Sequence, residues 1–157
     1  MNRREFIAYV ESNQKALRRF LTALCCGDSA LADDIAQETY MKAYMSADSF
    51  RGDARFSSWV YRIAYNTFVS YRRSVRPSTD VSEAAAIDSG DSSDSAFRYQ
   101  SLYAALDRLS ERERSSVLLF YIEGYSIKEI TAIVDASEDA VKQHLSRARK
   151  HLKTLLS

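Results

Sequence analysis

Apolar residues recur along most of the chain at the three- and four-residue spacing of amphipathic helices. The pattern is strongest near the C-terminus, where one stripe comprises Val141, Leu145, Ala148, Leu152 and Leu155. The other positions of that segment are rich in lysine, arginine and histidine, and residues 141–157 contain no acid. A helix with one apolar stripe and otherwise basic faces is typical of proteins that bind an anionic partner.

Three more helices are predicted in the first half of the chain, over residues 5–26, 30–48 and 57–74. Gly27 is a favourable stop for the first of them. The second has a polar side formed by Asp33, Asp34, Gln37 and Glu38. Spacing alone indicates that this side is a solvated helix face.

Aromatic and arginine residues alternate from Phe50 to Arg73. Unpaired bases stack on aromatic rings while cationic side chains hold the phosphate backbone, so this composition suits single-stranded nucleic acid. The same rings could instead fill a hydrophobic core. For Trp59 and Phe68 the core is the favoured interpretation, and for the loop of residues 50–56 both interpretations stay open.

Residues 76–96 contain the only proline of the chain, many serines and aspartates, and no aromatic residue. Such a segment lacks the apolar surface needed to fold and is predicted to be a flexible linker. It divides the chain into two small helical domains, residues 1–75 and residues 97–157. The charges of the three parts are +3 (11 basic and 8 acidic residues), −4 (1 and 5) and +2 (10 and 8). An acidic linker therefore masks two mildly basic lobes within a net charge of +1.

The second domain is predicted to contain four helices, which begin near residues 97, 111, 127 and 138. Ser-x-x-Glu capping boxes open the second and third of these helices, at Ser110 and Ser126. Only a break at residues 135–137 separates the last two, as in a helix-turn-helix. Because the chain has four glycines and one proline, turn-rich β folds are disfavoured. The expected fold class is all-α.

Composition also disfavours several functional classes. No apolar run approaches the roughly 20 residues of a membrane span, and the N-terminus lacks a signal-peptide pattern, so a cytoplasmic protein without membrane insertion is expected. Cys25 and Cys26 form no ligand pattern and are interpreted as buried thiols. His144 and His151 lie two helical turns apart, too far to share one metal. With no nucleophile or phosphate-loop pattern either, we expect no catalytic residues, metal or cofactor, and no enzyme.

Four segments occur in an informative order: ADDIAQETYMKAY, FRGDARFSSWVYRIAYN, LDRLSERERSSVLLFYIEGYSIKEIT and VKQHLSRARKHL. With the polar linker between the second and third, they resemble the extracytoplasmic-function (ECF) sigma factors of bacterial RNA polymerase. The resemblance covers about 135 of the 157 residues. It implies that the first domain is sigma region 2, which binds core polymerase and opens the −10 promoter element. The second domain would be sigma region 4, which reads the −35 element.

The resemblance implies roles for individual residues. The polar side of the second helix would bind the clamp of the largest polymerase subunit through Asp33, Asp34, Gln37 and Glu38. This implication reverses the interpretation of that side as a solvated face. The −10 element would be opened and read by Phe50, Arg51, Arg55, Phe56, Trp59, Asn66, Ser70, Tyr71, Arg72 and Arg73. The −35 element would be read in the major groove by Lys142, Gln143, His144, Ser146 and Arg147. The implied partners are core RNA polymerase, promoter DNA and an anti-sigma factor.

Two stretches depart from the usual pattern of that family. Ser70 stands where the family commonly has aspartate. Residues 137–144, SEDAVKQH, stand where it commonly reads Pro-x-Gly-Thr-Val-Lys-Ser-Arg, so that Gln143-His144 replaces Ser-Arg. Because glutamine can read adenine through two hydrogen bonds, we predict a −35 element unlike the usual one. The alternative function is a stand-alone helix-turn-helix transcriptional regulator. The aromatic and arginine segment disfavours it, since a reader of duplex DNA alone does not need such a segment.

Overall fold

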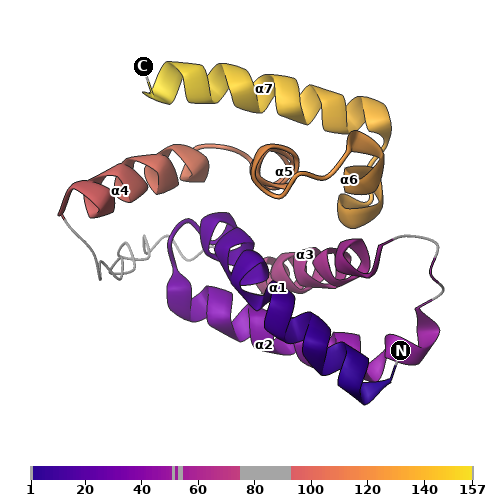
Figure 1. Cartoon of the computed structure of the whole chain (residues 1–157). Helices are drawn as coiled ribbons and strands as arrows, with labels where there is room; N and C mark the ends of the chain where they lie inside the picture. The colour runs from indigo at the N-terminus through magenta and orange to yellow at the C-terminus, as the bar shows by residue number, and fades with distance from the viewer. Residues whose placement is uncertain (1, 51, 53–54, 75–92, 157) are drawn as a thin grey trace.

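The computed structural model describes residues 2–50, 52, 55–74 and 93–156 (Figure 1). Within those ranges the chain is built from helices and connecting turns, and no residue lies in a strand. The all-α prediction is therefore confirmed. Arg51 and most of the predicted linker lie outside the described residues.

Three helices form the first lobe: α1 (Arg3–Leu24), α2 (Ser29–Met45) and α3 (Phe56–Ser74). A short 3₁₀ turn, η1 (Ala47–Ser49), follows α2. Helix α2 packs against both α1 and α3. The apolar stripes meet in a core that includes Leu17, Phe20, Leu21, Leu24, Ile35, Ala43, Val60, Ala64 and Phe68. The interpretation of Phe68 as a core residue is confirmed, because it is 2% exposed.

The second lobe comprises α4 (Ser93–Asp107), α5 (Glu111–Val117), η2 (Leu118–Ile122), α6 (Ile127–Val134) and α7 (Glu138–Leu156). Both predicted capping boxes are confirmed, since the Ser110 and Ser126 hydroxyls accept the backbone N–H groups of Glu113 and Glu129. Asp135 adopts a left-handed φ of 55° at the break between α6 and α7. Its short polar side chain tolerates that conformation better than most.

Two predictions of secondary structure need correction. Helix α4 begins at Ser93, so residues 93–96, which the sequence assigns to the linker, are helical. Serine and aspartate are common both in linkers and near helix starts, so composition alone does not fix where this helix begins. The segment after α5 is a π-helix, with the Glu123 N–H donating to the Leu118 carbonyl at 3.0 Å, five residues earlier.

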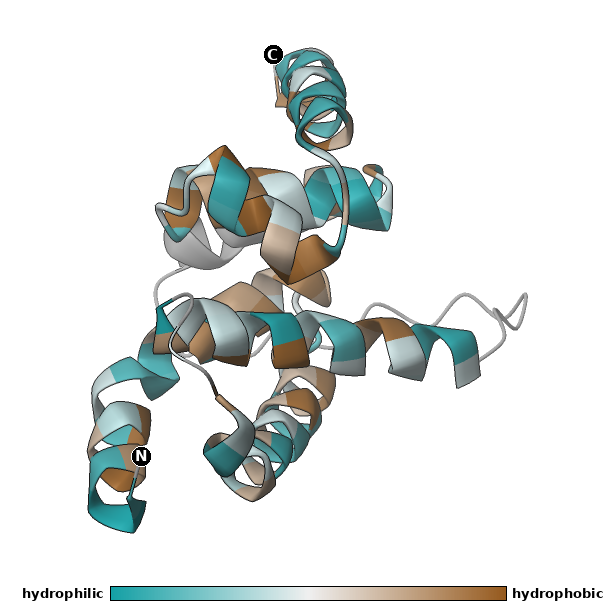
Figure 2. Ribbon diagram, turned by 90° about the vertical axis from the view of Figure 1, so that its right-hand side faces the viewer, coloured by the Kyte–Doolittle hydropathy of each residue, from teal (hydrophilic) through white to brown (hydrophobic). Residues whose placement is uncertain are grey.

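The two lobes pack against each other (Figure 1). Helix α6 lies along α3, and α1 contacts α4, α5 and η2. Buried apolar residues form one cluster that extends through both lobes. Figure 2 shows the brown, hydrophobic positions gathered between helices, whereas α7, which carries the C-terminus, is largely hydrophilic on its outer faces.

Candidate nucleic-acid interface

The polar side of α2 is presented to solvent. Asp34, Gln37 and Glu38 are exposed, and half-buried Asp33 forms an ion pair with Arg18 at 3.0 Å. An ion pair of 3.4 Å also joins Glu38 to Lys42 one helical turn later. Both pairs are exposed and therefore weak, so the carboxylates remain available to another basic partner.

Two methionines extend this face in a way that the sequence predictions missed. Met41 and Met45 follow Glu38 at i+3 and i+7, and they are 63% and 78% exposed. Large apolar side chains with that exposure, next to a polar helix face, are typical of a surface that binds another protein. The spacing was the available signal, because residues three, four and seven apart share one side of a helix.

The rings of Phe50, Phe56 and Trp59 form one cluster. Their centroids lie 5.1 Å (Phe50 to Phe56), 5.3 Å (Phe56 to Trp59) and 5.5 Å (Phe50 to Trp59) apart. Phe56 also meets Tyr9 of α1 at 4.8 Å in an edge-to-face arrangement. All three rings of the cluster are half-buried. They therefore pack partly against the first lobe and remain partly exposed to solvent.

Helix α3 has one exposed polar face and one buried face. Asn66, Ser70 and Arg73 recur at i, i+4 and i+7 and are exposed, as are Tyr71 and Arg72. The opposite side packs against the second lobe and includes buried Tyr61 and Tyr65. The polar groups of this stripe are therefore accessible from solvent.

Arg62 is a further cation on α3 that the sequence predictions left out. It is exposed and its Nη1 donates to the Ala132 carbonyl of the second lobe at 3.0 Å. Arg55 and Arg72 also reach the second lobe, where they pair with Glu129 and Glu111. Arg55, Arg62 and Arg72 are thus already engaged within the chain, and no periodicity in the sequence could have indicated these partners.

Helix α7 presents its basic side outward. Its apolar stripe buries Val141, Leu145 and Ala148 against the second lobe. Of the residues predicted to read DNA, Lys142, Gln143 and Arg147 are exposed. Ser146 is half-buried. The first turn of the helix is preceded by Ser137, whose hydroxyl accepts the Ala140 N–H at 3.1 Å. This cap satisfies a backbone N–H group in the first turn of α7, which has no partner within the helix.

His144 is placed differently from the other predicted readers. It is half-buried, and its Nδ1 is shielded from solvent without a hydrogen-bond partner. Burial, followed by the positive charges of Arg112 and Arg147, lowers the pKa of this imidazole despite nearby Glu113. The ring is therefore neutral at pH 7 and turned partly toward α5, so it is less available to a base than Gln143 or Arg147.

The described residues offer no separate chemical centre. Among them, no group of three or more histidine, cysteine, aspartate or glutamate side chains is placed to hold a metal ion. Burial raises the pKa of the Cys25 thiol to about 12 and that of Cys26 to about 11, so both thiols stay protonated. Within the described ranges, no helix is both long and apolar enough to cross a membrane.

Comparisons with known proteins agree with this arrangement. The family model of Sigma-70 region 2 matches residues 9–77, and that of Sigma-70 region 4 matches residues 99–152. The chain is 33% identical over 132 residues to the ECF RNA polymerase sigma-E factor of Escherichia coli K12, covering 74% of this chain and 69% of that protein.

Two further matches extend over more of the chain. It is 31% identical over 144 residues to the ECF RNA polymerase sigma factor EcfG of Rhodopseudomonas palustris, covering 90% of this chain and 79% of that protein. It superposes with a TM-score of 0.77 and 25% identity on the sigma factor RpoE of Bartonella quintana, solved with the anti-sigma factor NepR, covering 97% and 96% of the two chains. The chain matches both sigma regions in their usual order, one on each lobe, and it therefore belongs to the family of ECF RNA polymerase sigma factors.

Proposed function

We propose that this sigma factor binds core RNA polymerase through α2 and selects promoters through two separate surfaces on α3 and α7. The observation that carries the proposal is that each lobe presents its own exposed, polar helical face. The first consists of Asn66, Ser70 and Arg73, and the second of Lys142, Gln143 and Arg147. Two readers on one chain suit a promoter with two separated elements.

On the first lobe, α3 and the aromatic cluster act on the −10 element. Extruding a base from the duplex costs a few kcal/mol. Stacking that base on an aromatic ring recovers about 1–3 kcal/mol, and the half-buried Phe50, Phe56 and Trp59 supply such rings. The stripe of Asn66, Ser70 and Arg73 then contacts neighbouring bases and phosphates. Serine at position 70 offers a hydroxyl that both donates and accepts, which permits contact with several bases.

On the second lobe, the N-terminal half of α7 enters the major groove of the −35 element. Gln143 is exposed and can donate to N7 and accept from N6 of adenine at once. Lys142 and Arg147 hold phosphates or guanine. His144 plays a smaller part in this proposal than the sequence suggests, because its ring is half-buried and neutral.

The polymerase contact combines charge with apolar area. Asp34, Gln37 and Glu38 recognise a basic helical partner, namely the clamp of the largest polymerase subunit. Met41 and Met45 add exposed apolar surface to the same face. Methionine adapts to irregular surfaces, so this pair contributes affinity while the carboxylates set the register.

The same assignment gives the chain its place of action and a third partner. The chain performs no chemistry of its own and acts in the cytoplasm with the polymerase. The sigma factor RpoE of Bartonella quintana was solved in complex with the anti-sigma factor NepR. That complex supports an anti-sigma protein as a partner of this chain, beside core polymerase and promoter DNA.

Run-off transcription with purified core polymerase tests this function. We expect transcripts that appear only when the protein is added, and a product pattern identical to that of core polymerase alone would contradict the proposal. A gel-shift experiment without polymerase separates it from the stand-alone regulator. The sigma assignment predicts no stable complex with duplex DNA in that experiment, whereas a regulator would bind.

A further inference from the structure

Lys42 of α2 reaches across to α3 within the first lobe. Its Nζ lies 3.4 Å from the Oε1 atom of Glu38 and 3.2 Å from the hydroxyl oxygen of Thr67 on α3. Glu38, one helical turn before Lys42, belongs to the face of α2 proposed to bind polymerase. One ammonium group is therefore shared between that face and the helix proposed to read the −10 element.

The direction of the hydrogen bond between Lys42 and Thr67 is fixed by a second bond. The Thr67 hydroxyl donates its proton to the Ile63 carbonyl at 2.8 Å, so toward Lys42 it acts as an acceptor. Thr67 is 2% exposed, whereas the Lys42 side chain is 47% exposed. The bond is therefore partly shielded from water, and its donor is charged, which makes it stronger than a bond between two neutral groups.

Thr67 lies next to the exposed polar stripe of α3. Asn66 precedes it in the chain, and Ser70 follows it three residues later, on the same part of the helix. Apolar packing of Ala64 and Phe68 also holds α3 in the lobe, but apolar contacts are non-directional. A hydrogen bond is directional. The bond from Lys42 therefore restricts the rotation of α3 at the level of Asn66 and Ser70.

The pair between Lys42 and Glu38 is the more easily exchanged of the two contacts. Both side chains are about half exposed, at 47% and 57%, and they lie one helical turn apart, so the pair is weak. A basic group of the polymerase can replace Lys42 as the partner of Glu38 at little cost. Lys42 then keeps Thr67 as its acceptor, and the contact between α2 and α3 persists when polymerase is bound.

We infer that Lys42 is a positioning residue for −10 recognition. It acts through Thr67 and fixes the readers Asn66 and Ser70 relative to the helix that binds polymerase. This inference rests on the proposed function of α2 and α3. In that proposal the readers contact the promoter, whereas Lys42 contacts Thr67. The competing role for Lys42 is a direct bond to a promoter phosphate, which would not depend on the Thr67 hydroxyl.

The test measures the affinity of holoenzyme, assembled from core polymerase and the full chain, for a fluorescent −10 oligonucleotide. The oligonucleotide is the non-template strand of a promoter whose start site has been mapped with this protein. Lys42→Met removes the charge, and Thr67→Val removes the hydroxyl. We expect each variant to bind about 10-fold more weakly, as for loss of one hydrogen bond from a charged group. The double variant should bind no more weakly than either single variant, because both remove the same contact.

Two matched controls accompany these variants. Lys15→Met removes an exposed lysine of α1. Thr39→Val changes a buried threonine of α2 whose hydroxyl likewise donates to the carbonyl four residues earlier, at 2.7 Å. Both controls should bind the oligonucleotide as the parent does, and Thr67→Ser, which keeps the hydroxyl, should restore parental binding. In a titration with core polymerase, Thr67→Val should match the parent, because Thr67 is buried on α3.

Far-UV circular dichroism and a cooperative melt establish that each variant is folded. A Thr67→Val holoenzyme that binds the oligonucleotide as tightly as the parent would overturn the inference. If Lys42→Met were still defective, Lys42 would be assigned to a promoter phosphate instead. Losses that multiply in the double variant would also contradict the inference, because the two residues would then act independently.

Amide hydrogen exchange in the protein without polymerase tests the positioning separately from promoter binding. Residues 66–70 should exchange faster in Lys42→Met than in Lys15→Met, because α3 is then held less firmly. Equal exchange rates would refute the positioning role. A parental holoenzyme that binds the −10 oligonucleotide no better than a scrambled sequence would count against the proposed function of α3 instead.

Discussion

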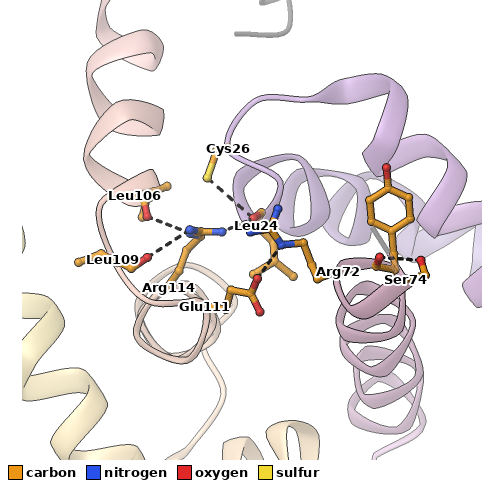
Figure 3. A network of polar contacts seen from close by, with 9 residues as sticks. Leu24, Cys26, Arg72, Ser74, Leu106, Leu109, Glu111 and Arg114 are labelled. Carbon is orange, nitrogen blue, oxygen red and sulfur yellow. Dashed lines mark hydrogen bonds and ion pairs between the residues drawn. The ribbon is translucent and has the colours of Figure 1, made fainter. Parts of the chain in front are cut away.

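Replacement of Arg114 by methionine should strongly destabilise the second lobe. Arg114 is 5% exposed, and its guanidinium donates to three backbone carbonyls (Figure 3). They are those of Leu106 at 2.9 Å, Leu24 at 2.8 Å and Leu109 at 3.2 Å. Leu24 ends α1 and Leu106 lies in the last turn of α4, so one cation satisfies the negative ends of two helices.

The magnitude follows from the groups that lose their partner. Methionine fills most of the volume but donates nothing, so the carbonyls of Leu106 and Leu109 become unsatisfied within the second lobe. At about 1–3 kcal/mol for each buried polar group, the expected loss is about 2–6 kcal/mol of the free energy of unfolding. The Leu24 carbonyl belongs to the first lobe, and the loss of its hydrogen bond from Arg114 weakens the contact between the lobes. For a domain of this size, the midpoint of unfolding should fall by on the order of 20 °C.

Urea and thermal unfolding followed by far-UV circular dichroism measure this loss. The matched control is Arg108→Met, an exposed arginine in the turn after α4, which should change the free energy of unfolding by less than about 0.5 kcal/mol. Arg114→Lys should recover only part of the stability, because an ammonium group lacks the fork that reaches three carbonyls. The reasoning is refuted if Arg114→Met is as stable as Arg108→Met.

Three further predictions concern function and pH. Gln143→Ala should reduce run-off transcription from a preferred promoter by about 10- to 100-fold, as expected for loss of a bidentate base contact of about 1–3 kcal/mol. Its binding to core polymerase should be unchanged, and weaker polymerase binding would assign Gln143 another role. Met45→Asp should weaken core polymerase binding in a fluorescence titration, and an affinity equal to that of the exposed control variant Glu11→Lys would remove Met45 from the interface. The pKa of His144 is lowered in the folded protein, whereas in the unfolded protein it has its ordinary value of about 6.5. As pH falls below about 6.5, the unfolded state therefore binds more protons than the folded state, and the free energy of unfolding decreases. His144→Gln should lose that part of the slope in urea titrations, and equal slopes for the two proteins would contradict the burial of His144.

Local signals in the sequence predict much of this fold because they depend on neighbouring residues. The Ser110 and Ser126 capping boxes are confirmed by hydrogen bonds within each helix start. The break at Asp135 is confirmed by its left-handed backbone. The apolar stripe of α7 is buried at Val141, as its spacing predicts. Each of these features is specified within about four residues, which is the range over which periodicity and capping act.

The features that the sequence did not predict depend on distant parts of the chain. Arg114 looks like a solvated residue of an amphipathic helix, yet it binds the Leu24 carbonyl 90 residues away. The π-turn at Leu118–Ile122 has the composition of an α-helix, and its extra residue places Glu123 between the lobes. The contact between Phe50 and Phe56, whose rings are both half-buried, is likewise a tertiary contact that their spacing does not specify. Propensity cannot settle such cases, because tertiary contacts decide them.

Mapping of transcript start sites tests the central claim most directly. Core polymerase would transcribe genomic fragments alone, with this protein, and with its Gln143→Ala variant, and the 5′ ends would be sequenced. We expect new start sites that depend on the protein and share two separated upstream elements, with only the element farther upstream relaxed by the variant. Start sites identical to those of core polymerase alone, or a variant effect confined to the downstream element, would contradict promoter selection by two readers.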